Sequence, residues 1–169
     1  GTVDSVEVAS LAFANADAAG TASGTWRASP GGPGVVDGKA QLTRVDQRAI
    51  ARYLPRAVGE GVQSWITSAI TAGRIETASF TLKGDLARFP FPDPKQGSFT
   101  VATSVRGGGL AYAEGWPAIR DLDADIRFEL SSLTVDAKRG SILGATLGPT
   151  KLTIADLRAQ LAATGTTLT

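Results

Sequence analysis

Residues 122 to 130 read Leu-Asp-Ala-Asp-Ile-Arg-Phe-Glu-Leu, and this stretch decides the fold class. Apolar residues alternate with charged ones along its whole length, so an extended chain here has one apolar side and one charged side. The pattern is typical of a half-buried strand in an antiparallel sheet. It continues with Leu133, Val135 and Ala137, and Lys138-Arg139-Gly140-Ser141 then predicts a turn.

The same two-residue period predicts further strands on both sides of this pair. They are expected near 5–13, 20–28, 35–44, 75–84, 97–105, 109–113, 141–147 and 150–155. Between two of them the chain reads Phe89-Pro90-Phe91-Pro92-Asp93-Pro94. Because proline fixes φ and removes a backbone donor, we expect a stiff, extended connection here. It would block pairing at a sheet edge and hold Phe89 and Phe91 as plugs beside the helix expected to carry Trp65, so that the loop covers one side of the sheet.

The period changes to that of a helix over about 46–72. Asp46 is placed to cap a short helix through Tyr53, and a second helix is expected between Gly59 and Gly73. The apolar stripe of the second helix is expected to dock on the sheet; it consists of Val62, Trp65, Ile66, Ala69 and Ile70. The helical insertion would therefore cover part of one face.

These elements predict a mainly β chain with a helical insertion, an α+β fold, forming a single segment over residues 1–169. The 20 glycines fit a turn-rich antiparallel protein rather than a helical bundle. Periodicity alone leaves two architectures open. The sheet could stay open and curve into a groove, or it could close into a β-sandwich whose apolar faces pack on each other.

Composition excludes several classes of function. The chain carries 17 basic and 16 acidic residues, so it lacks the positive surface that nucleic-acid binding requires. It has no histidine and no cysteine, which removes the familiar catalytic triads and the commonest zinc ligands. No run of about 18 apolar residues predicts a membrane span. The chain starts with Gly1, and we expect it to be a segment of a longer protein.

Two motifs suggest chemistry but have simpler interpretations. The stretch 34–40 contains Gly-Lys, yet it lacks the other residues of a phosphate-binding loop and is expected to enter a strand. The run Asp121, Asp123 and Asp125 lacks the glycine and the bidentate acid of a calcium loop, so we expect no metal site. With Glu129, these carboxylates leave a glycosidase as a remote alternative.

Arginines recur every fourth residue over 44–56, and Arg48 and Arg52 share one face of the first expected helix. An exposed, solvated face is the favoured interpretation. Contact with anionic lipid headgroups is the functional alternative.

A series of ordered motifs gives the chain a family resemblance. They are Gly24-Thr25-Trp26, Tyr53-Leu54-Pro55, Trp65-Ile66, Phe80-Thr81-Leu82-Lys83-Gly84-Asp85-Leu86, Phe89-Pro90-Phe91, Gly97-Ser98-Phe99, Leu110-Ala111-Tyr112 and Gly115-Trp116-Pro117-Ala118-Ile119. In this order they resemble the central region of the YhdP family, the AsmA-like envelope proteins of Gram-negative bacteria. The resemblance covers most of residues 8 to 145.

The resemblance implies a long periplasmic protein, anchored at the inner membrane and built as a twisted β-sheet curled into an apolar, taco-like groove. Such proteins are implicated in phospholipid transport between the inner and outer membranes and in outer-membrane integrity. The implied partners are phospholipid acyl chains, the rest of the same long chain, and membrane proteins at the two ends of the assembly. No cofactor and no catalytic residue is implied.

On this interpretation the groove is lined by the apolar sides of the strands. The expected lining or core residues are Phe80, Leu82, Phe99, Val101, Ile126, Phe128, Leu130, Leu133 and Val135. The alternative function is that of a structural or interaction module of the cell envelope, a closed sandwich that binds no lipid.

Overall fold

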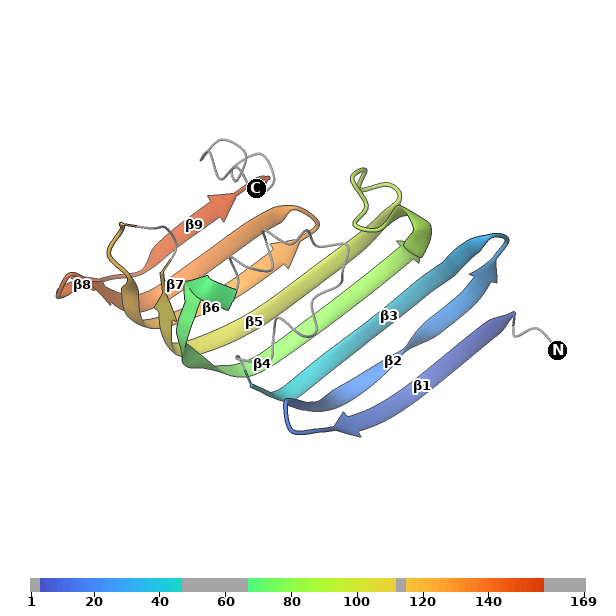
Figure 1. Cartoon of the computed structure of the whole chain (residues 1–169), viewed down its shortest axis with the longest axis horizontal. Helices are drawn as coiled ribbons and strands as arrows, with labels where there is room; N and C mark the ends of the chain where they lie inside the picture. Colours follow the sequence, from blue (N-terminus) through green and yellow to red (C-terminus); the bar gives the residue numbers. More distant parts are fainter. Residues whose placement is uncertain (1–3, 47–66, 112–114, 157–169) are drawn as a thin grey trace.

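All strands of the structure belong to one antiparallel sheet (Figure 1). The computed structural model describes residues 4–46, 67–111 and 115–156. The strands are β1 (Ser5–Ala14), β2 (Ala18–Ser29), β3 (Gly32–Val45), β4 (Ile70–Asp85), β5 (Gly97–Leu110), β6 (Ile119–Glu129), β7 (Ser132–Ile142), β8 (Ala145–Leu147) and β9 (Thr150–Ile154). A short 3₁₀ helix, η2 (Leu86–Arg88), follows β4. The prediction of a mainly β chain is therefore confirmed.

The sheet is a meander in which each strand pairs with the next one along the chain. The order runs from β1 to β8, and β9 returns to pair with residues 133–137 of β7. The sheet does not close into a barrel, and β1 forms one edge while β8 and β9 form the other. A closed sandwich needs two sheets packed face to face. That alternative is wrong for the described part of the chain, which forms one sheet.

Two tight hairpins differ from the sequence prediction. β7 runs through Gly140 to Ile142, so the turn expected at residues 138–141 is wrong. The chain reverses two residues later, at Leu143-Gly144, where both residues have positive φ, at 52° and 81°. β6 likewise ends at Glu129, and Leu130 takes up φ 53° in the turn before β7. Leu130 therefore belongs to a turn rather than to a strand.

β4 and β5 are longer than predicted. β4 begins at Ile70, so the helix expected to end before Gly73 is wrong over residues 70–72. Ile70 pairs with Leu110 of β5, and a Cβ added to Gly73 would lie 2.8 Å from the Cα of Gly108. The pairing of this segment with β5 therefore prevails over the apolar spacing that predicted a helix. Only residues 67–69 form a helical turn among the described residues of the expected insertion.

The register of the sheet separates two faces. Phe80 pairs with Ala40 on one side and with Val101 on the other, and the same row continues through Phe128 and Leu133. On the opposite face, Ser79 pairs with Gln41 and Ala102, and this row continues to Arg127 and Thr134. One face is thus mainly apolar across the sheet, and the other is mainly polar.

The sheet encloses little core. Among the described residues, the buried hydrophobic side chains are Ala18, Ala69, Ala78, Phe91, Leu122 and Ala124. The accessible surface is 10938 Å² for a 17.4 kDa chain. A compact monomer of that mass exposes about 7900 Å². A larger surface fits the arrangement of the described strands, which form one open sheet with few buried side chains.

Candidate functional site

The apolar face of the sheet gathers almost all of the predicted lining residues. Those that lie in strands are half-buried and share this face, namely Phe80, Leu82, Phe99, Val101, Ile126, Phe128, Leu133 and Val135. The face extends to both edges, where Leu11 of β1 and Leu152 of β9 are 53% and 50% exposed. The apolar face therefore crosses the sheet from one edge to the other.

A path of phenylalanine rings crosses one end of this face. The ring centroids of Phe99 and Phe128 are 6.0 Å apart, and those of Phe89 and Phe99 are 5.5 Å apart. Phe89 also meets Phe91, at 5.6 Å. All three pairs are edge-to-face, an arrangement worth roughly 0.5 to 1.5 kcal/mol per pair beyond the buried area. The rings thus join the β4–β5 connection to strands β5 and β6.

The phenylalanine loop, residues 86–96, connects β4 to β5. Its Phe91 is 1% exposed and fills a notch over Gly84 and Gly97, which pair across the two strands. A Cβ added to either glycine would come within 2.8 or 2.6 Å of the ring. The two glycines therefore leave the space that the ring occupies.

The loop is compact, so the expected extended connection is wrong. The Asp85 side chain accepts a hydrogen bond from the Ala87 amide at the start of η2, at 3.0 Å. The Phe91 amide then donates to the Arg88 carbonyl at 2.8 Å. The loop also joins two interior strands, so the prolines do not protect a sheet edge as expected. Proline here is compatible with turns rather than with an edge strand.

Of the residues expected in the helical insertion, some lie outside the described part of the chain, while Ala69 directly precedes β4 and Ile70 begins it. Val62, Trp65, Ile66 and the two arginines proposed for headgroup contact, Arg48 and Arg52, lie outside the described residues. Ala69 is fully buried, and its carbonyl accepts from the Ala111 amide at 2.8 Å. Ile70 is 37% exposed and lies in β4, not in a helix.

The polar face holds the acidic run. Asp123 accepts from Arg139 at 2.6 Å and from the Gly107 amide at 2.9 Å, and these two hydrogen bonds hold the pKa of Asp123 below its usual range. Asp125 accepts from Lys138 and Ser104, both at 2.7 Å, and its pKa is also lowered. Both carboxylates therefore act as partners in cross-strand ion pairs. In the described ranges no group of three or more acidic side chains is arranged to hold a metal ion.

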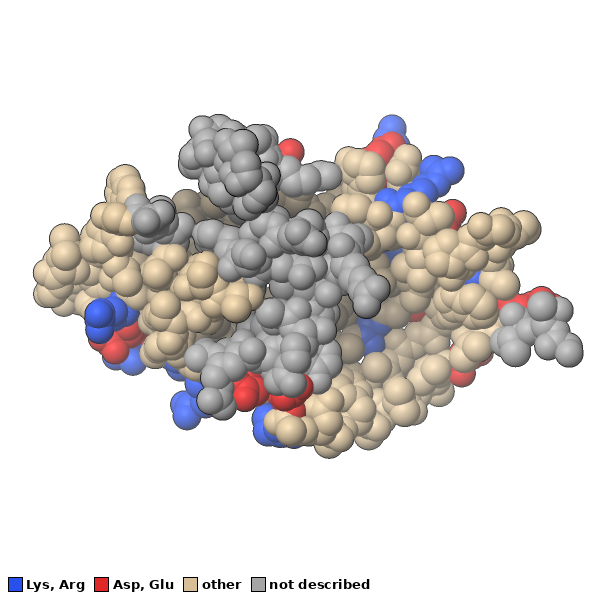
Figure 2. All heavy atoms as spheres, viewed as in Figure 1, with Lys and Arg blue, Asp and Glu red and all other residues tan. Residues whose placement is uncertain are grey.

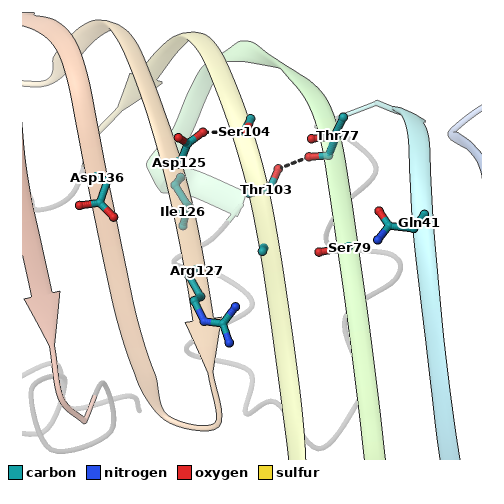
Figure 3. A pocket seen from close by; sticks show the side chains of 10 residues that line it. Gln41, Thr77, Ser79, Thr103, Ser104, Asp125, Ile126, Arg127 and Asp136 are labelled. Atoms are coloured by element: carbon teal, nitrogen blue, oxygen red, sulfur yellow. Dashed lines mark hydrogen bonds between the residues drawn. The ribbon is translucent and has the colours of Figure 1, made fainter.

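A shallow hollow lies on the sheet between β3 and β7 (Figure 3). Its volume is about 320 Å³, and it is lined by Gln41, Thr77, Ser79, Ala102, Thr103, Ser104, Asp125, Ile126, Arg127 and Asp136. Sequence analysis did not anticipate this hollow, because its residues come from five strands. Its lining contains no aromatic ring on which a sugar could stack, and it offers mainly hydroxyl, amide and charged groups.

Charged groups are unevenly distributed over the molecule. Figure 2 shows one side, where acidic and basic side chains gather mainly along the outline of the described surface. The ion pairs Lys83–Asp37, Lys138–Asp125 and Arg139–Asp123 all join residues of the polar face. No helix in the described ranges is long and apolar enough to cross a bilayer.

The fold and its two faces define the class: an open, single-layered antiparallel sheet with one apolar face and one polar face. The chain belongs to the YhdP protein family, whose sequence model matches residues 4–167. The family resemblance found in the sequence is thereby confirmed.

One curated relative carries a functional name. The chain is 28% identical over 78 residues to the intermembrane phospholipid transporter YhdP of Escherichia coli strain K12. The match covers 46% of this chain and 6% of the E. coli protein, so this chain corresponds to a small part of that relative. No solved structure matches this chain significantly.

Proposed function

We propose that this chain is a non-enzymatic segment of a phospholipid-transport protein, and that its apolar face receives acyl chains. The observation that carries the proposal is the continuous apolar face of an open sheet. Phe80, Val101 and Ile126 on this face remain half-buried in the described structure. Each methylene that moves from water onto such a surface gains up to about 0.8 kcal/mol when fully buried.

The proposed path runs across the strands rather than along them. Rows of apolar residues cross the sheet from β1 to β9, and the sheet ends in open edges on both sides. Curling of this sheet would turn the apolar face into a groove that holds tails, while headgroups stay at the open side in water. The rest of the same long chain would continue the groove at both edges.

The proposed setting is the periplasm, within a protein anchored at the inner membrane. There the segment would support phospholipid movement between the inner and outer membranes and hence outer-membrane integrity. Family membership and the named activity of the E. coli relative support this setting. Inner- and outer-membrane proteins at the two ends of the assembly are the proposed partners.

A matched pair of β4 substitutions tests lipid binding. Leu82→Glu places a charge on the apolar face, whereas Thr81→Glu places the same charge on the polar face beside Lys39. Native mass spectrometry of the purified full-length protein should show phospholipid with the wild type and Thr81→Glu, and a large loss with Leu82→Glu. Equal lipid content in both variants, or a lipid-free wild type, would favour a structural module that binds no lipid.

A further inference from the structure

We propose that the phenylalanine loop is a fixed clamp on the acyl path, in which Phe91 is the anchor and Phe89 is the group that touches the acyl chain. The inference rests on the proposed function and deepens it. On this proposal, the phenylalanine loop limits the width that is available to acyl chains at this end of the apolar face. The apolar strands alone do not limit it.

The anchor of the clamp is the buried ring of Phe91. The Gly84–Gly97 pair leaves a side-chain-free notch in the apolar face, and the ring fills it. η2, at the start of the loop, also lies against β3. The loop therefore folds back over the ends of β3, β4 and β5 instead of extending away from them, and a buried ring holds it there.

The contact residue is Phe89. Its ring meets Phe91 on one side and Phe99 on the other, at 5.6 and 5.5 Å, yet Phe89 remains half-buried. Phe99 lies on the apolar face, paired with Leu82. Phe89 therefore lies beside the surface on which acyl chains are proposed to lie.

The ring path gives the clamp a stiff wall. Phe89, Phe99 and Phe128 come from the loop, β5 and β6, and each is held edge-to-face by its neighbour. An acyl chain that crosses from β3 to β6 at this end of the strands would run along this wall. Aromatic side chains have few rotatable bonds, so the wall would keep its shape as chains pass.

Photo-crosslinking in the full-length protein tests the contact. The photoreactive phenylalanine derivative p-benzoylphenylalanine is placed at Phe89, at Val101 on the apolar face, or at Asp93 on the exposed part of the loop. Phospholipid adducts are expected at positions 89 and 101 and not at 93. An adduct at 101 without one at 89, or equal yields at 89 and 93, overturns the clamp and leaves the proposed function standing. Absence of adducts at both 101 and 89 overturns both.

A size series at position 89 tests the width. Phe89→Ala shortens the wall and should lower the lipid adduct yield at position 101 severalfold, while Phe89→Leu restores apolar bulk and should recover most of it. Circular dichroism and thermal unfolding verify that both variants fold. Wild-type yield in a folded Phe89→Ala protein would overturn the clamp.

Discussion

At the scale of single residues, the Phe91 ring fills the space that the missing side chains of Gly84 and Gly97 leave. Gly84 and Gly97 lie at the two ends of the loop that carries Phe91, so the notch and the ring that fills it are separated by only a few residues. Ring and notch therefore form together as the β4–β5 hairpin closes. Among the described residues, Phe91 is the largest side chain that is fully buried.

Replacing Phe91 by alanine should destabilise the chain by roughly 3 to 5 kcal/mol, the usual cost of emptying a buried phenylalanine site. Denaturant unfolding monitored by circular dichroism measures the change. Phe89→Ala is the matched control and should cost less, since Phe89 is only half-buried. Equal losses in the two variants would show that Phe91 is not the anchor.

The Asp123–Arg139 pair makes a prediction about pH. The folded state lowers the pKa of Asp123, chiefly through the Arg139 hydrogen bond and then the Gly107 amide. The ionised form is therefore favoured by folding, so its stabilising contribution is present above the unfolded pKa and is lost as pH falls through the folded pKa. Asp123 is 13% exposed, although Arg139 is 68% exposed and solvent weakens the pair.

Arg139→Gln should raise the pKa of Asp123 towards the ordinary aspartate value, without restoring it fully because the Gly107 amide remains. NMR titration of the Asp123 carboxyl carbon measures both midpoints. An unchanged midpoint in the variant would show that Arg139 does not hold the carboxylate in solution.

At the scale of elements, the β7–β8 hairpin carries an unfavourable residue. Leu143 has φ 52° and is 86% exposed, at a turn position where asparagine is preferred. Leu143→Asn should stabilise the chain by about 1 kcal/mol, because asparagine tolerates the left-handed region better than leucine. Leu143→Val should destabilise it, since β-branched residues fit that region poorly. Thermal unfolding compares the three proteins, and a Val variant as stable as the Asn variant would contradict the prediction.

The sequence predicted the strands better than their ends. The alternation over 122–130 correctly assigned Leu122 and Ala124 to a buried side, because a two-residue period directly encodes the faces of a strand. The end of β6 at Glu129 was missed, since the apolar Leu130 continues the pattern although it lies in a turn. The turn at Leu143-Gly144 was missed because the preceding Lys138-Arg139-Gly140-Ser141 resembles a turn more closely.

The candidate site was predictable in its strands and not in its loop. Phe80, Val101 and Phe128 were expected on the apolar sides of their strands within the groove interpretation, and the register places them in one row. The extended form expected for residues 89–94 rested on proline content. Proline also suits compact turns, and the notch that draws Phe91 inward depends on the pairing of Gly84 with Gly97 across the loop. That pairing is not visible in a local pattern.

At the scale of the whole molecule, surface area distinguishes this sheet from a compact domain. The apolar dye ANS should fluoresce strongly with the native protein, because an open apolar face provides a binding surface. Phospholipid or detergent should raise the melting temperature by binding to the folded state. Leu82→Glu should weaken both effects. If the native protein did not increase ANS fluorescence, the prediction would be contradicted.

The open edges have a mechanical consequence. β1 and β9 lie at opposite edges of the meander, so a pull applied to these two strands acts across the sheet and loads the hydrogen bonds of the outermost strand pairs first. Such a sheet would lose its strands one after another, because the hydrogen bonds of each pair break in sequence. A sheet pulled along its strands would instead load all the hydrogen bonds of a pair at once. Stretching would then lengthen the chain in small steps, beginning with the outermost strands. The interior β4–β5 hairpin, which holds the buried Phe91 ring, would open last.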